Sequence, residues 1–143
     1  DLLEFEKDIY STGFYRNKAK NIIGAAKIID KKYKGKVPKD FNQLLELPGV
    51  ARKTANCVMG NAFNIATGVV VDTHVIRITE KLGLTKNKDP KKIEEDLIKL
   101  LPKEEWINFS HMIIWHGRKI CIARRPKCEI CILNRVCPSA HSL

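Results

Sequence analysis

Four cysteines near the end of the chain carry its clearest chemical signal. They are Cys121, Cys128, Cys131 and Cys137, and the fifth cysteine, Cys57, stands far from them. Thiolates at this spacing can close around a cubane of iron and sulfide, with one sulfur bound to each iron. A structural zinc site usually joins two close pairs, and only Cys128 and Cys131 form a close pair here. The spacing therefore favours a [4Fe-4S] cluster over zinc, and two disulfides are the third interpretation.

Basic side chains are concentrated around these cysteines. Arg124, Arg125 and Lys127 lie between the first two, and Arg118 lies just before them. The whole chain has 26 Lys and Arg against 16 Asp and Glu, a formal charge of +10 that attracts a polyanion. A loop stiffened by a metal centre holds such cations in place for phosphate oxygens. We expect nucleic acid contact, and the competing interpretation is a solvated basic loop.

A second candidate site is the segment Leu47-Pro48-Gly49-Val50-Ala51-Arg52. Pro-Gly breaks one helical pattern just before another begins, which predicts a tight hairpin between two helices. The start of the second helix offers unpaired backbone amides and the positive end of the helix dipole to an anion. We therefore expect Leu47, Gly49, Val50, Ala51 and Arg52 to contact DNA phosphates without reading bases. An ordinary helical turn is the alternative.

Two further side chains could take part in catalysis. Lys53 follows the hairpin in the first turn of the predicted helix, where the dipole and Arg52 favour a neutral, nucleophilic amine. Asp72 precedes another predicted helix and is, by default, its N-cap. Taken singly, an exposed lysine and a capping aspartate are ordinary features, so their context must decide their roles.

Hydrophobic periodicity predicts an all-α protein. The expected helices cover 14–33, 40–45, 51–62, 72–82, 89–101 and 103–116, with Asp40 and Asp89 as the expected caps of the second and fifth. Residues 69–71 are expected as an extended, buried connector. The remaining candidates for chemistry are assigned to structure instead: Cys57, His74 and His111 to local packing, and Trp106 and Trp115 to core or interdomain packing.

Composition also limits where the protein works. No apolar run is long enough to cross a bilayer, and no leader peptide is apparent. Metal-binding thiolates suit a reducing compartment, so we expect an intracellular protein, in the cytoplasm or nucleoid of a prokaryote. A monomer is expected. The chain begins with Asp1 rather than methionine, which suggests truncation.

Three motifs in a fixed order identify a known pattern. They are LPGVARKTAN at 47–56, VDTH at 71–74, and the four-cysteine tail preceded by HGR at 116–118. Together they resemble the endonuclease III family of helix-hairpin-helix DNA glycosylase/AP lyases with a [4Fe-4S] cluster, over about 14–137. The resemblance implies two helical domains with an interdomain cleft. Residues 1–66 would form a partial six-helix domain with the helix-hairpin-helix at about 40–62, N-terminal helices missing, and 67–143 the cluster domain with loop 121–137.

The resemblance also implies a bifunctional enzyme of base excision repair. Lys53 would attack the sugar of a damaged nucleotide, Asp72 would stabilise the developing charge, and β-elimination would nick the strand. The implied substrate is double-stranded DNA with oxidised pyrimidines or abasic sites. Ala51 departs from the family, which commonly has glycine there. Because of the missing helices, a truncated non-catalytic DNA-binding fragment remains an alternative, and a monofunctional glycosylase is another.

Overall fold

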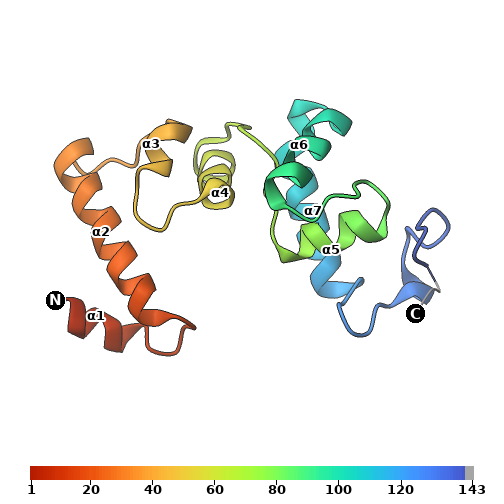
Figure 1. Ribbon diagram of the computed structural model, residues 1–143, viewed down its shortest axis with the longest axis horizontal. Helices are drawn as coiled ribbons and strands as arrows, with labels where there is room; N and C mark the ends of the chain where they lie inside the picture. The colour runs from red at the N-terminus through yellow and green to blue at the C-terminus, as the bar shows by residue number, and fades with distance from the viewer. Residues whose placement is uncertain (141–143) are drawn as a thin grey trace. The chain divides into compact units, whose positions relative to one another are not determined.

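The computed structural model describes residues 1–140, in which every regular element is helical and no strand occurs (Figure 1). The predicted all-α fold is therefore confirmed. The elements in order are α1 (Leu2–Asp8), α2 (Tyr15–Tyr33), α3 (Phe41–Leu45), α4 (Arg52–Phe63), α5 (Thr73–Lys81), α6 (Pro90–Leu100), η1 (Lys103–Glu105), α7 (Trp106–Lys119) and η2 (Cys128–Ile130). No helix within residues 1–140 is both long enough and apolar enough to cross a membrane.

The chain forms two compact units, and the first is Asp1–Ala55. It contains α1, α2, α3 and the first turn of α4, with α1 packed against α2. The sequence patterns did not predict α1, which has no buried residue. Helix α2 ends at Lys34 and Gly35, both with left-handed backbone φ angles of 52° and 75°. The predicted cap of α3 is confirmed, because the Asp40 side chain accepts a hydrogen bond from the Gln43 amide.

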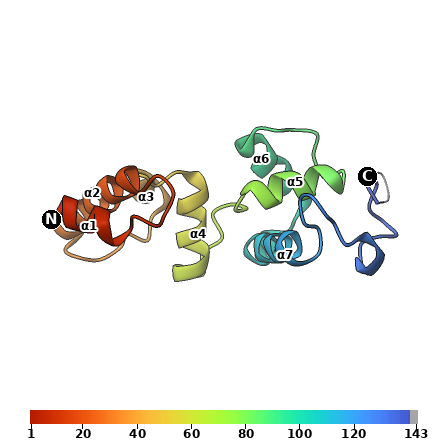
Figure 2. The same cartoon turned by 90° about the horizontal axis from the view of Figure 1, so that it is seen from below.

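The second unit begins at Asn56 and holds the rest of α4 together with α5, α6 and α7. Helices α5 and α7 lie side by side (Figures 1 and 2). A single hydrophobic core joins the connector to α5, α6 and α7; its buried members are Val69, Val71, Val75, Ile78, Ile93, Leu97 and Ile113. Residues 64–72 contain no helix or strand, and the expected burial of the connector is confirmed for Val69 and Val71, whereas Val70 is half-buried.

Two more predicted helix starts are confirmed in this unit. Asp89 accepts hydrogen bonds from the amides of Lys91 and Lys92 at the start of α6. Asp72 does the same for α5. One packing prediction is wrong in part: Trp115 is 60% exposed, so it is not a core residue of this unit. Trp106 is half-buried, and its indole donates to the Leu101 carbonyl over 3.0 Å.

Candidate DNA interface and active site

The predicted hairpin between α3 and α4 is present. Leu47 is buried, and its carbonyl accepts a hydrogen bond from the Val50 amide over 3.1 Å, which closes the turn. Gly49 inside this turn has φ +76°, a conformation that costs residues with a Cβ free energy. The predicted role of Pro48-Gly49 as a helix breaker is confirmed.

Close packing against α2 supports the hairpin. A Cβ on Gly49 would lie 2.9 Å from the Cβ and Nδ2 atoms of Asn21, and one on Gly24 would lie 3.2 Å from Pro48. The guanidinium of Arg52 lies over the Phe41 ring, with its Cζ atom 5.2 Å from the ring centroid. The turn is therefore held from two sides while Gly49 remains exposed.

Lys53 is the second residue of α4 and its side chain is exposed. The Ala51 carbonyl accepts from the Ala55 amide over 2.9 Å, so the helical ladder begins at Ala51. The amides of the first turn have no intrahelical acceptors. An anion at this turn would meet those amides and the Arg52 guanidinium, and Lys53 presents the amine nearest to them in sequence.

The Asp72 carboxyl group uses its two oxygens differently. Its Oδ1 atom accepts hydrogen bonds from the amides of His74 and Val75, both over 2.9 Å. These bonds fix the rotamer and cap α5. Within residues 1–140 no hydrogen bond is made to Oδ2, and the side chain is only half-buried. The second oxygen is thus held in a defined place from which it can stabilise a developing positive charge.

The structure draws attention to Phe14, which the sequence analysis did not select. It is the N-cap of α2, has a left-handed φ of 56° and is 87% exposed. The neighbouring Tyr10 and Tyr15 rings pair at 5.0 Å, and Arg16 lies over Tyr15. Strained backbone that presents a large apolar side chain to solvent is unusual and often functional. The available signal was an aromatic residue at a cap position that Ser, Thr, Asp or Asn normally occupies.

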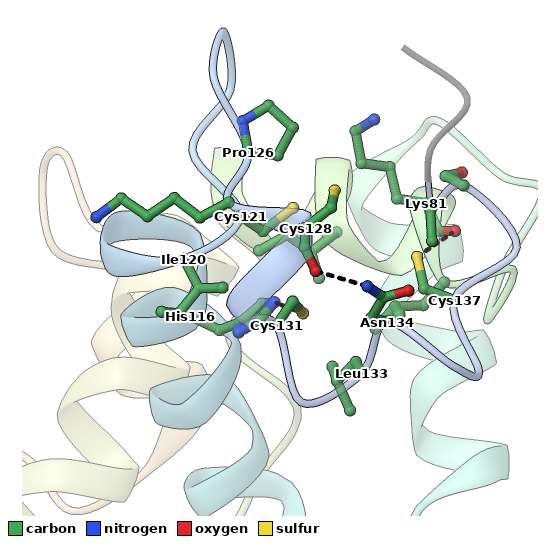
Figure 3. Close-up of a pocket in the computed structure, with 15 residues that line it drawn as sticks. Lys81, His116, Ile120, Cys121, Pro126, Cys128, Cys131, Leu133, Asn134 and Cys137 are labelled. Carbon is green, nitrogen blue, oxygen red and sulfur yellow. Dashed lines mark hydrogen bonds between the residues drawn. The ribbon is translucent and has the colours of Figure 1, made fainter.

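All four cysteines of the tail line one cavity (Figure 3). Each is half-buried and none is in a disulfide. The Cys137 thiol donates to the Lys81 carbonyl over 3.7 Å, and the Asn134 amide donates to the Cys128 carbonyl over 2.8 Å (Figure 3). The disulfide interpretation therefore has no support among the described residues.

Side chains from α5 and α7 also contact these sulfurs. Arg77 donates to the Cys121 Sγ atom over 3.5 Å and to the Gly117 carbonyl over 3.4 Å. The His116 Nε2 atom lies 3.8 Å from the Cys131 sulfur. Burial lowers the pKa of His116 below its ordinary value, and the positive charge of Arg77 acts in the same direction. The cavity is thus lined by four thiols and the His116 imidazole, with Lys81 and Lys127 also among its lining residues.

The loop that carries the basic residues is tied to the end of α7. The amides of Cys121 and Lys127 donate to the carbonyls of His116 and Ile120, over 2.8 and 3.0 Å. These two bonds close the loop at both ends. The predicted phosphate-binding side chains are all exposed; they are Arg118, Arg124, Arg125 and Lys127.

The donor set of this cavity fits an iron-sulfur cluster. Four soft thiols and no carboxylate are the ligands that iron-sulfur centres use. Within residues 1–140, no three His, Cys, Asp or Glu side chains lie close enough together to hold a single metal ion. A four-iron cluster instead takes one thiolate at each iron, so its ligands surround a larger group.

A hairpin between helices, a capped aspartate and a thiol-lined loop define a helical protein of the helix-hairpin-helix class with an iron-sulfur loop. Residues 1–103 match the family model of the HhH-GPD superfamily base excision DNA repair protein, and residues 121–137 match the iron-sulfur binding domain of endonuclease III. The chain belongs to the HhH-GPD superfamily of base excision DNA repair proteins, and its cofactor is a [4Fe-4S] cluster.

Individual relatives agree with this assignment. The chain is 56% identical to an endonuclease III of Synechocystis over 142 residues, which cover 99% of this chain and 65% of the relative. It superimposes with a TM-score of 0.93 and 42% identity on a non-covalent endonuclease III-DNA complex, covering 99% of this chain and 66% of that one. A trapped endonuclease III-DNA covalent intermediate matches equally well, with 67% of its chain covered. The chain thus spans about 65% of the length of its Synechocystis relative.

Proposed function

We propose that this chain carries the catalytic groups of a bifunctional DNA glycosylase/AP lyase. The enzyme excises oxidised pyrimidines from duplex DNA and nicks the strand by β-elimination during base excision repair. The observation that carries the proposal is the match to a trapped covalent DNA intermediate at 42% identity. A covalent intermediate of this kind needs a nucleophile from the protein, and Lys53 is an exposed amine at the hairpin.

The proposed reaction begins with a damaged nucleotide rotated out of the helix, because the glycosidic bond is inaccessible in the base stack. The neutral Lys53 amine attacks the sugar C1′, so a C–N bond forms. The bond from C1′ to the base breaks, and its electron pair leaves with the base, which takes up a proton. Asp72 stabilises the positive charge that develops on the sugar through its Oδ2 atom.

The second half of the reaction nicks the strand. The C1′–O4′ bond then breaks and O4′ takes up a proton, which opens the sugar ring and leaves an iminium between C1′ and the Lys53 nitrogen. This iminium makes the C2′ proton acidic. Loss of this proton forms a C2′–C3′ double bond, and the electron pair of the C3′–O bond leaves with the 3′ phosphate. Hydrolysis of the iminium by water then releases the amine of Lys53. No external oxidant or reductant is needed.

The same proposal assigns the contacts to DNA. Phosphates are bound by the hairpin residues Leu47, Gly49, Val50, Ala51 and Arg52 and by the cluster-loop residues Arg118, Arg124, Arg125 and Lys127. Phe14 is the apolar wedge that enters the base stack, since it is exposed and rigidly presented. The cluster is bound by Cys121, Cys128, Cys131 and Cys137, and when bound it stiffens this loop.

The remaining assignments rest on the same family pattern. We propose that the partial six-helix domain covers 1–66 and the cluster domain 67–143. We propose further that the protein acts as a monomer inside the cell, where a reducing environment keeps the cluster ligands as thiolates.

Borohydride trapping on the complete, cluster-loaded protein tests the proposal. Duplex DNA with an oxidised pyrimidine or an abasic site should give a covalent adduct, and Lys53→Gln should abolish it. Lys27→Gln, which removes the same charge from an exposed position of α2, should leave trapping unchanged. Trapping that survives Lys53→Gln would refute the role of Lys53. Salt-dependent binding without adduct or nick would point to a non-catalytic DNA-binding protein, and base release without a nick to a monofunctional glycosylase.

A further inference from the structure

A buried polar cluster lies beside the connector that leads to Asp72. Asn56 of α4 is 3% exposed and Glu94 of α6 is 4% exposed. The Asn56 Nδ2 atom donates to the Glu94 Oε1 atom over 2.8 Å, and the Thr67 hydroxyl donates to the Asn56 Oδ1 atom over 2.9 Å. Both polar atoms of the Asn56 amide are therefore hydrogen-bonded: Nδ2 to Glu94 on α6 and Oδ1 to Thr67 on the connector.

The connector backbone passes directly over this amide-carboxyl pair at Gly68. A Cβ at this position would lie 2.1 Å from the Glu94 Oε1 atom and 2.7 Å from the Asn56 Nδ2 atom. Neither contact is possible for real atoms, so only glycine lets the chain approach so closely. The approach fixes where the connector crosses α4 and α6.

The rest of the connector is held over the next four residues. The side chains of Val69 and Val71 are buried, and the Val70 amide donates to the Ser110 Oγ atom over 3.0 Å. That hydroxyl in turn donates to the Trp106 carbonyl over 2.9 Å. The chain thus reaches Asp72 with consecutive residues anchored and little freedom to shift along its own direction.

A polar cluster is a costly way to hold a core together. Burying a carboxyl and an amide carries a desolvation cost that apolar side chains of similar size avoid. Hydrogen bonds add directionality. The amide-carboxyl pair forms in only one register of the connector against α4 and α6, and a shifted connector would leave buried polar atoms unpaired. The same amide lies one helical turn beyond Lys53 on α4. Asn56 of this polar cluster thus follows Lys53 on α4, and Thr67 of the same cluster precedes Asp72 on the connector.

From these contacts we propose that Asn56, Thr67 and Glu94 are positioning residues for the lyase reaction: they hold the connector in the register that places the Asp72 carboxyl group. The inference rests on the proposed function, and it predicts an effect on the chemical step rather than on DNA affinity. A misplacement of about 1 Å can lower a rate by about 100-fold without loss of folding.

The test exchanges hydrogen-bonding partners in the complete, cluster-loaded protein. Asn56→Asp removes the N–H donor and sets two carboxyl groups against each other, whereas Glu94→Gln keeps an acceptor oxygen for Asn56. The double variant Asn56→Asp/Glu94→Gln restores a donor-acceptor pair in reversed order and still accepts from Thr67. Thr67→Val removes only the hydroxyl and should fold normally. Asn17→Asp at an exposed position of α2 and Glu95→Gln at an exposed position of α6 are the matched controls.

The readouts are the single-turnover rate of borohydride trapping and the Kd for the same DNA. We expect Asn56→Asp to slow trapping by roughly 10- to 100-fold and Thr67→Val by roughly 3- to 10-fold. The Kd should stay within about threefold, and the double variant and Glu94→Gln should trap within about threefold of the parent protein. Equal losses of rate and affinity, or a double variant as slow as Asn56→Asp, would overturn the proposal.

Thr67→Val keeps the proposal testable if Asn56→Asp does not fold: a trapping rate equal to that of the parent protein would then refute it. The Lys53→Gln variant distinguishes a failure of the positioning role from a failure of the proposed lyase function. If Lys53→Gln abolishes trapping while Asn56→Asp and Thr67→Val trap normally, the positioning role fails and the proposed function stands. If Lys53→Gln still traps, the proposed function itself fails.

Discussion

Gly49 of the hairpin and Asn21 of α2 are in such close contact that a Cβ on the glycine would lie 2.9 Å from two atoms of the asparagine side chain. Gly49 also has a left-handed φ of +76°. The position therefore excludes other residues for two independent reasons, one conformational and one steric.

Gly49→Ala should destabilise the protein by more than the conformational cost alone, which is about 1–2 kcal/mol. Gly35→Ala is the matched control, because Gly35 has φ +75° but nothing within 4 Å of an added Cβ. Urea unfolding of both variants measures the difference. We expect Gly49→Ala also to weaken DNA binding, since the turn must shift away from Asn21. Equal stability losses for the two variants would mean that Asn21 moves aside without cost.

Asp72→Asn should retain the fold and lose the chemistry. Asparagine caps helices as well as aspartate does, so the bonds to His74 and Val75 are kept and stability should change by only a few tenths of a kcal/mol. The lost charge should lower the trapping rate by about 100- to 1000-fold. Asp89→Asn is the matched control, because Asp89 caps α6 through two amides in the same way. Comparable activity of the two variants would exclude an electrostatic role for Asp72.

Phe14→Gly should separate stability from function. The side chain is 87% exposed, so its removal sacrifices little packing, and glycine adopts the left-handed backbone without strain. We expect the free energy of unfolding to stay constant or to rise by up to about 1 kcal/mol. Excision of a base from duplex DNA should slow, while reaction at an already single-stranded abasic site should change less. A variant that is less stable but fully active would contradict the wedge assignment.

Cys131→Ser should remove the visible absorbance of the cluster and loosen loop 121–137, because a bound cluster ties its four cysteines together. Limited proteolysis should then cut within the loop while the first compact unit, residues 1–55, stays protected. Cys57→Ser serves as the control, because this fifth cysteine accepts a hydrogen bond from Asn61 far from the loop in sequence. A colourless parent protein that contains zinc would reverse the assignment of the cofactor.

Several features of this protein were determined by the sequence alone, because their physical causes are local. Asp40, Asp72 and Asp89 cap helices as predicted, since a cap needs only a short polar side chain and the next three amides. The Pro48-Gly49 break needs only one residue with positive φ. The clustering of four cysteines in one cavity follows from their spacing within a short loop.

Tertiary structure alone decided the features that depend on distant residues. Asn56 and Glu94 are paired across 38 positions, and no periodic pattern marks either one as buried. Trp115 was expected in core or interdomain packing, yet it is 60% exposed, because burial depends on which face of a helix its neighbours cover. A local signal specifies an element and its ends, whereas the choice of partner depends on contacts that form only after the elements pack.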